Sequence, residues 1–247
     1  MESLKDALKS GRNLKGIWLA SGSHVAAEIA ALSGFDWCLI DLEHGYGSEA
    51  DALRMIQAMG RTQIHIVVRV PCLRGDIISR CLDFGAEGIM LPMVSTKTEA
   101  ESFAKTLRYP PAGTRGMSSS CRAAAYGLMF SDYFNGTGAA PVGIAQIETQ
   151  TAVANINEIA STEGIDVLFI GHSDLSLQLG CFRQFDAPAM LAAENSVLNA
   201  CNRFEKAPGA ILRPAMKGKS NLETKGGLFA LGTDVESLKG AFAALLK

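Results

Sequence analysis

Short apolar runs alternate with longer amphipathic stretches along almost the whole chain. Most of the runs are continuously apolar, as in strands that are buried on both faces, and lack the half-polar alternation of one-sided strands. The predicted strands cover Gly16–Ala20, Trp37–Leu42, His65–Val70, Gly88–Met93, Val142–Ile147, Asp166–Ile170, Ala210–Leu212 and Leu228–Leu231. The helical segments between them include Val25–Leu32, Glu49–Met59, Ile77–Phe84, Glu99–Leu107 and Ala152–Ile159.

A repeated strand–helix–strand order predicts parallel strands joined by right-handed crossovers. Eight such units in 247 residues favour an α/β fold of the (β/α)8 TIM-barrel type, with residues 1–247 as a single domain. A doubly wound open sheet is the alternative, which is weakened because no glycine-rich dinucleotide motif follows the first strand. The stretch Tyr109–Pro141 is rich in Pro, Gly and Ser and is interpreted as a functional loop insertion.

Composition excludes several classes of partner. Hydrophobic residues make up 48% and charged residues 19% of the chain, and the net charge is -2, so neither nucleic acid nor a membrane is expected as a partner. No apolar run reaches the ~20 residues of a spanning helix, and the polar N-terminus does not resemble a secretory signal. The six cysteines form no C-x-x-C pair and are expected to be free thiols. These features predict a cytoplasmic protein.

Charged side chains follow four of the predicted strands. Asp41, Glu43 and His44 end the second, Arg69 the third and Glu148 the fifth, while Asp174 follows the sixth at the start of a helix. The carboxyl ends of the strands carry the chemistry of a parallel barrel, so these groups are expected to share one polar pocket. A purely structural network of ion pairs would leave the same pattern.

Glu148 and Asp174 are hard oxygen donors at the ends of neighbouring strands. Two carboxylates with room for water and substrate oxygens suit Mg²⁺ or Mn²⁺ better than Zn²⁺, although they could also act as an acid/base pair. Arg69 offers a planar fork for a carboxylate or an enolate oxygen, and its structural alternative is an ion pair with Glu43 or Glu148.

His44 is the best acid/base candidate, because it follows a strand beside two acids and an imidazole titrates near neutral pH. Motifs of serine hydrolases, Walker loops and zinc peptidases are missing from the sequence. None of the predicted strands contains the lysine that a Schiff-base aldolase would need. The pattern therefore favours chemistry assisted by a metal ion.

Motifs spread over nearly the whole chain resemble the HpcH/HpaI family of metal-dependent pyruvate aldolases. They are Gly16-Ile17-Trp18-Leu19, Gly34-Phe35-Asp36-Trp37, Asp41-Leu42-Glu43-His44-Gly45, Val68-Arg69-Val70-Pro71, Leu91-Pro92-Met93, residues 109–116, Gln146-Ile147-Glu148-Thr149 and Asp174-Leu175-Ser176. The resemblance implies a homo-oligomer, a hexamer or trimer of dimers with exchanged C-terminal helices. It also implies a divalent metal cofactor, Mg²⁺, Mn²⁺ or Co²⁺.

The resemblance also assigns roles by position. Glu148 and Asp174 match the metal ligands, Arg69 the group that binds the pyruvyl oxygens, and His44 the base. Asp83 matches the acid that orients this base, and Asp41 a nearby polar support. Gln146 and the backbone N–H groups of Ser173 and Asp174 match the cradle of the pyruvyl carboxylate, as a helix N-terminus would favour. Trp18 is expected to line the pocket, and Arg122 to meet an acidic tail of the aldehyde.

Two departures from the family pattern concern the second substrate. His172 replaces the usual proline after the sixth strand, and the region Arg183–Lys225 is shorter than in the family. The expected reaction is the reversible cleavage of a 4-hydroxy-2-oxo acid into pyruvate and an aldehyde through the enolate of pyruvate. The alternatives are a lyase for a CoA thioester such as malyl-CoA or citryl-CoA, a barrel without catalytic activity, and a phosphate-binding isomerase.

Overall fold

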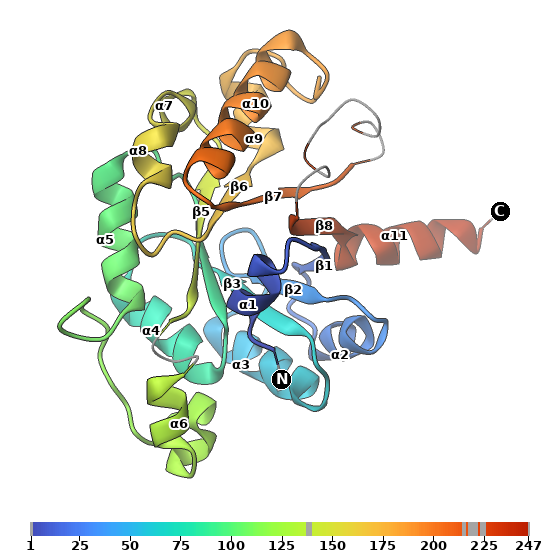
Figure 1. Ribbon diagram of the computed structural model, residues 1–247. Helices are drawn as coiled ribbons and strands as arrows, with labels where there is room; N and C mark the ends of the chain where they lie inside the picture. Colours follow the sequence, from blue (N-terminus) through green and yellow to red (C-terminus); the bar gives the residue numbers. More distant parts are fainter. Residues whose placement is uncertain (1, 137–139, 214–215, 217–221, 223–225, 247) are drawn as a thin grey trace.

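The computed structural model of the chain is a closed barrel of eight parallel strands surrounded by helices (Figure 1). It describes residues 2–136, 140–213, 216, 222 and 226–246. The strands are β1 (Asn13–Leu19), β2 (Trp37–Asp41), β3 (His65–Arg69), β4 (Gly88–Leu91), β5 (Val142–Ile147), β6 (Val167–Ile170), β7 (Ala207–Ile211) and β8 (Gly227–Thr233). Each strand pairs with the next, and β8 pairs with β1. The prediction of a (β/α)8 barrel is confirmed, and an open sheet is excluded.

Helices or helical turns follow most strands, and several begin at a hydroxyl side chain. The helices are α1 (Leu4–Lys9), α2 (His24–Leu32), α3 (Glu49–Ala58), α4 (Gly75–Phe84), α5 (Lys97–Leu107), α6 (Phe130–Asn135), α7 (Gln150–Ala154), α8 (Ile156–Ala160), α9 (His172–Gln178), α10 (Pro188–Arg203) and α11 (Asp234–Ala244), with short 3₁₀ turns η1 (Met59–Arg61) and η2 (Arg122–Gly127). Ser23, Thr96 and Thr149 each accept a backbone N–H of the first turn, which satisfies a donor that the helix leaves open.

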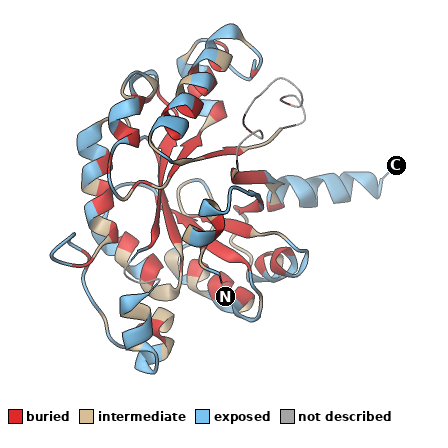
Figure 2. Ribbon diagram, viewed as in Figure 1, coloured by how far each residue is buried: buried red, intermediate tan, exposed pale blue. Residues whose placement is uncertain are grey.

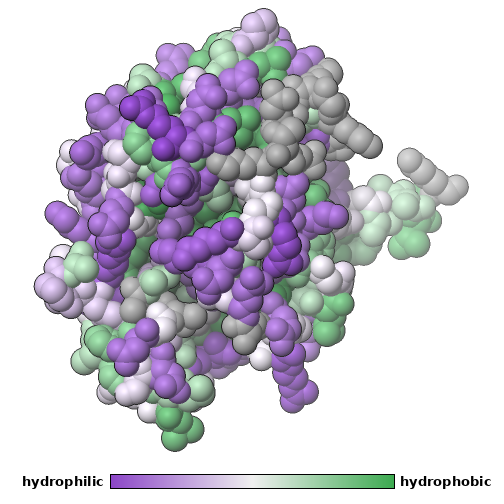
Figure 3. All heavy atoms as spheres, viewed as in Figure 1, coloured by the Kyte–Doolittle hydropathy of each residue, from purple (hydrophilic) through white to green (hydrophobic). Residues whose placement is uncertain are grey.

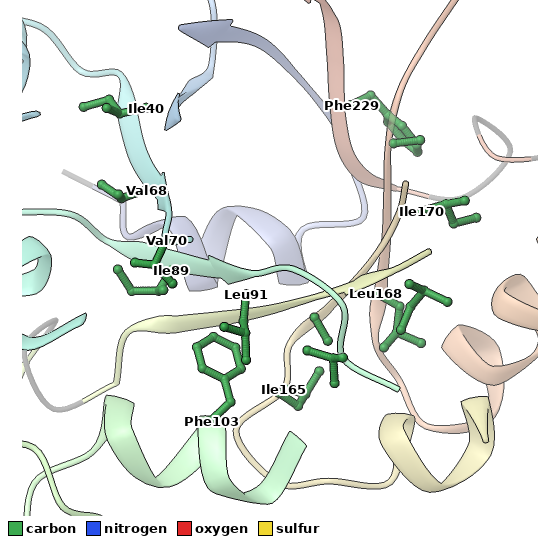
Figure 4. Packing of buried hydrophobic residues seen from close by; sticks show 14 of the residues in the cluster. Ile40, Val68, Val70, Ile89, Leu91, Phe103, Ile165, Leu168, Ile170 and Phe229 are labelled. Atoms are coloured by element: carbon green, nitrogen blue, oxygen red, sulfur yellow. The ribbon is translucent and has the colours of Figure 1, made fainter. Parts of the chain in front are cut away.

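Alternate side chains of the strands build two apolar layers. Residues such as Leu39, Val67 and Ile144 point into the barrel. Their neighbours pack outward against the helices, as Figure 4 shows for Leu91 beside Phe103 of α5. In Figure 2 the strands are buried and the outer faces of the surrounding helices are exposed. A continuous apolar run is therefore what such a strand requires.

α1 lies at the amino-terminal end of the barrel. Its Leu4 and Ala7 are buried with the interior side chains, and the backbone N–H of Leu4 donates to Glu87 at 3.0 Å. The helix contributes these side chains to the interior layer at the end opposite to the carboxyl ends of the strands. Among the described residues no helix combines the length and apolarity needed to cross a membrane.

Most elements differ from their predicted bounds by one to three residues, and β5 alone among the strands keeps the predicted range. Three of the differences have a local explanation. β7 begins at Ala207, before the predicted Ala210, because Pro208 and Gly209 are strand residues here although both weaken the strand signal. The predicted helix Ala152–Ile159 is split into α7 and α8 at Asn155, whose side chain donates to the carbonyl of Ser95 at 2.9 Å. The predicted insertion after Tyr109 contains η2 and α6.

Candidate active site

Strand periodicity brings the predicted site residues together. Asp41, Arg69 and Gln146 each lie two positions after a side chain that points into the barrel, so they point to the same side. Glu148 continues this spacing just beyond β5, and Asp41 and Arg69 are also register partners across β2 and β3. The carboxyl ends of these three strands therefore bring polar side chains together at the barrel axis.

A cavity of about 190 Å³ lies at this end of the barrel. It is lined by Trp18, His44, Arg69, Gln146, Phe169, Ile170, Gly171, His172, Ser173, Asp174, Ile211, Arg213 and Thr233. The structure thus brings six predicted residues to one cavity: Trp18, His44, Arg69, Gln146, Ser173 and Asp174. Trp18, which was expected to line the pocket, lies in the wall of this cavity.

Asp41 holds the guanidinium of Arg69 in a two-point contact. Nε and Nη2 of Arg69 donate to Asp41 at 2.9 and 2.6 Å, and the indole N–H of Trp18 donates to the same carboxylate at 3.0 Å. Burial would raise the pKa of Asp41, but the hydrogen bonds and charge of Arg69 and the hydrogen bond from Trp18 lower it below its ordinary value. Asp41 therefore stays ionised and fixes the orientation of Arg69.

Glu43 forms a second contact with Arg69, at 2.8 Å from Nη1, as the structural alternative for this arginine predicted. Burial raises the pKa of Glu43 above its ordinary value, although the charge of Arg69 opposes this effect. His44 follows Glu43, and its Nε2 lies 4.0 Å from the Glu43 carboxylate. The imidazole of His44 lines the cavity. Its side chain is 72% exposed, so it is in contact with water.

Glu148 is a buried carboxylate beside the cavity. It accepts the backbone N–H of Met93 at 2.8 Å and the side-chain amide of Gln146. A Cβ atom at Gly171 would overlap the Glu148 carboxylate, so only glycine fits at this position after β6. Burial raises the pKa of Glu148 to about 7, and the negative charges of Asp174 and Glu43 add to this effect.

The carboxylates of Glu148 and Asp174 fit a divalent cation. Their charges act on each other, and Asp174 has no hydrogen bond or ion pair with another described side chain. The buried Oε1 of Gln146 also has no hydrogen-bond partner within the described part of the chain. No group of three or more His, Cys, Asp and Glu residues is arranged as a metal site among the described residues. Two carboxylates are the set that Mg²⁺ commonly uses, with water and substrate oxygens completing its coordination.

Two predicted residues lie away from the cavity within one chain. Asp83 is in the last turn of α4, at the end of the barrel opposite to His44, and its carboxylate pairs with Arg115 at 2.7 Å. Arg122 donates to the carbonyl of Phe84 at 2.7 Å, at the same opposite end. The structure therefore does not bring Asp83 to His44 or Arg122 to the cavity. The helix that follows β3 carries Asp83 back to the amino-terminal end, which motif matching alone does not reveal.

Sequence reasoning missed several residues of the cavity wall, namely Phe169, Ile211, Arg213 and Thr233. Arg213 follows β7 as the other site charges follow their strands, and this was the signal that could have revealed it. Pro214 and Ala215, which come next in the sequence, lie outside the described residues. The region Arg183–Lys225 also lies only partly within the described residues.

Comparisons with known proteins show the family to which the chain belongs. The sequence profile of the HpcH/HpaI aldolase/citrate lyase family matches residues 14–241. A 4-hydroxy-2-oxo-heptane-1,7-dioate aldolase from Salmonella arizonae is 35% identical over 98% of this chain and 92% of its own. The crystal structure of a family member from Burkholderia cenocepacia has a TM-score of 0.92 and 32% identity, covering 100% of this chain and 98% of that one.

An aldolase structure from Desulfitobacterium hafniense has a TM-score of 0.90 and 25% identity, and the similarity covers 100% of this chain and 96% of that one. These similarities extend over the barrel and include the strands that carry the cavity residues. They confirm the predicted aldolase class, a carbon–carbon lyase. The chain belongs to the HpcH/HpaI aldolase/citrate lyase family.

Proposed function

We propose that the protein catalyses the reversible cleavage of a 4-hydroxy-2-oxo acid into pyruvate and an aldehyde, with Mg²⁺, Mn²⁺ or Co²⁺ as cofactor. One observation carries this proposal. The carboxylates of Glu148 and Asp174, which have no cationic partner among the described residues, lie at the same cavity as the guanidinium of Arg69 and the imidazole of His44. The relatives named 4-hydroxy-2-oxo-heptane-1,7-dioate aldolases support the substrate class. They also favour it over a CoA thioester.

Glu148 and Asp174 would hold the metal ion. When bound, a divalent cation stabilises the negative charge that develops on the 2-oxo group during carbon–carbon bond cleavage. Gln146 and the backbone N–H groups of Ser173 and Asp174 are the proposed partners of the pyruvyl carboxylate. These N–H groups belong to the first turn of α9, where the helix leaves them without an internal acceptor.

Arg69 stabilises the charge that develops on the pyruvyl oxygens. A guanidinium has five N–H donors, and the contacts with Asp41 and Glu43 leave donors free for the substrate. Because Asp41 and Trp18 fix its orientation, Arg69 needs little reorganisation when the charge appears. Asp41 and Trp18 are thus positioning residues for Arg69.

His44 is the proposed base. Its imidazole removes the proton of the 4-hydroxyl group while the C3–C4 bond breaks and the electron pair moves into the enolate of pyruvate. The aldehyde leaves, and protonation of the enolate at C3 gives pyruvate. Exposure of His44 allows its proton to pass to water before the next cycle.

The test is pyruvate release by the chelator-treated protein before and after addition of Mg²⁺, Mn²⁺ or Co²⁺. We expect no release without metal and recovery with it. His44→Ala should lower the rate by about 10²–10⁴-fold and leave the affinity for Mn²⁺ unchanged, whereas His24→Ala, at an exposed histidine of α2, should match the wild type. Full activity of the metal-free protein, or borohydride trapping of pyruvate on a lysine, would contradict the proposal.

We further propose that the protein is a homo-oligomer and works in the cytoplasm. Of the described α11 residues only Asp234 is buried, and the helix projects away from the barrel (Figure 1). Its apolar side chains include Phe242, which is 64% exposed, and Figure 3 shows hydrophobic atoms along this helix. A second copy of the chain would bury them. The six free cysteines support a reducing compartment.

A further inference from the structure

We propose that Arg213 binds a carboxylate at the far end of the aldehyde, so that the enzyme prefers aldehydes with an anionic tail. The inference rests on the proposed function and assigns a specificity to the same cavity. The acidic tail was expected to meet Arg122, which the structure places at the opposite end of the barrel. Arg213 is a guanidinium that lies in the cavity wall itself.

The position of Arg213 follows from the periodicity of β7. Ala207 and Ile211 of this strand pack against the interior side chains, and Arg213 lies two residues further along. Ile211 and Arg213 both line the cavity, next to Ser173 at the start of α9. The side chain is therefore directed to the space that the substrate would occupy.

Neutral groups hold the Arg213 side chain. Its guanidinium carbon lies 5.7 Å from the centre of the Phe185 ring, within the range of a cation–π contact. Its Nη2 donates to the hydroxyl of Ser173 at 3.4 Å. Phe185 packs edge-on against His172, with ring centres 5.9 Å apart, and His172 lies 3.4 Å from the buried Glu194. His172 thus positions Arg213 through Phe185.

The guanidinium groups of Arg213 and Arg69 contact different partners. Arg69 meets the two carboxylates of Asp41 and Glu43. Arg213 has no ion pair with a carboxylate of the described residues, and its Nε is buried without a hydrogen-bond partner among them. Because the aromatic ring and the hydroxyl that contact Arg213 are neutral, its positive charge can still bind an anionic ligand. A guanidinium matches a carboxylate in two-point geometry.

The product chemistry indicates which group would reach Arg213. Cleavage between C3 and C4 of a 4-hydroxy-2-oxo-heptane-1,7-dioate, the compound in the names of the relatives, gives pyruvate and 4-oxobutanoate. The pyruvyl carboxylate has its proposed partners in Gln146 and the α9 backbone. A second carboxylate on the aldehyde would otherwise enter a cavity with nearby acids and lose its hydration without compensation.

The test compares aldol addition of pyruvate to 4-oxobutanoate and to pentanal, a neutral aldehyde of similar length, with Mn²⁺ present. The wild type should prefer 4-oxobutanoate. Arg213→Met should lower kcat/KM for 4-oxobutanoate by about 10²-fold, the loss of one charge-assisted contact, and that for pentanal by less than about threefold. Arg213→Lys should recover part of the preference, and Arg203→Met, at an exposed arginine of α10, should keep all of it.

Metal-dependent hydrogen–deuterium exchange at C3 of pyruvate, measured by NMR without aldehyde, separates the two proposals. A wild type that lacks this exchange overturns the proposed function. A wild type that has it but shows no preference for 4-oxobutanoate overturns only the role of Arg213. Equal losses for both aldehydes in Arg213→Met also overturn it. A higher KM for pyruvate in the exchange reaction would instead show that Arg213 binds the pyruvyl carboxylate. Arg213→Gln replaces the methionine variant if that variant does not fold.

Discussion

Glu148 shows how a site residue can weaken the fold that contains it. Its carboxylate is buried beside the charges of Asp174 and Glu43, and burial raises its pKa to about 7 from an ordinary value of 4.5. Between these pH values the unfolded chain releases the proton and the folded protein retains it. Metal-free protein should therefore lose stability as the pH rises from 4.5 through 7, by about 3 kcal/mol in total.

Glu148→Gln should remove this pH dependence, because an amide carries no charge to desolvate. Urea unfolding in the presence of a chelator should show similar stabilities for wild type and variant at pH 5. At pH 8 the variant should be more stable than the wild type. Addition of Mn²⁺ at pH 8 should stabilise the wild type and leave the variant almost unchanged. A wild type whose metal-free stability is constant between pH 5 and 8 would refute this account of Glu148.

Single residues also show how far the sequence determines the position of a side chain in the fold. Asp41, Arg69 and Glu148 were predictable because strand ends converge in any parallel barrel and the strands themselves were clear. Asp83 and Arg122 were assigned by motif alone, and their positions depend on the path of a helix and of a long insertion. Arg213 had a clear strand-end signal, but the proline and glycine of β7 hid the strand that it follows.

At the scale of elements, the segment between α5 and β5 depends on one buried arginine. Arg115 donates to Asp83 at 2.7 Å and to the Tyr133 hydroxyl at 2.8 Å, and its guanidinium lies 4.6 Å from the centre of the Tyr109 ring. It therefore joins the start of the segment, helix α6 and helix α4. The composition predicted an insertion here, but not this anchor, because its contacts join residues far apart in the sequence.

Arg115→Met should lower the free energy of unfolding by about 3 kcal/mol, since Asp83 and Tyr133, both partly buried, lose the buried guanidinium that they contact. Limited proteolysis of the variant should cut faster near the exposed Leu128. Arg108→Met is the matched control, because Arg108 pairs with the exposed Glu163, and it should cost less than about 1 kcal/mol. If both variants unfold at the same urea concentration, Arg115 is not the anchor of the segment.

The whole molecule consists of a well-packed barrel and a helix, α11, that packs little against it. α2 also exposes apolar side chains, among them Ile29 and Leu32, in addition to those of α11. The order of strands predicts the barrel because each unit packs on its neighbours in sequence. The apolar residues of α11 instead resemble those of an ordinary amphipathic helix, and only the structure shows that the barrel does not cover them.

We propose that a second copy of the chain buries the apolar side chains of α11, and the mass of the protein in solution tests this proposal. Phe242→Asp replaces the exposed aromatic ring of α11 with a charge, whose burial against a partner would be costly. Sedimentation should then show particles of the single-chain mass of 26.2 kDa, whereas the wild type should sediment as a larger assembly. Ser237→Asp adds the same charge at an exposed polar position of α11 and should leave the assembly intact. The Phe242→Asp monomer should retain its far-UV circular dichroism, because the barrel is closed within one chain. A wild type that already has the single-chain mass would rule out the proposed assembly.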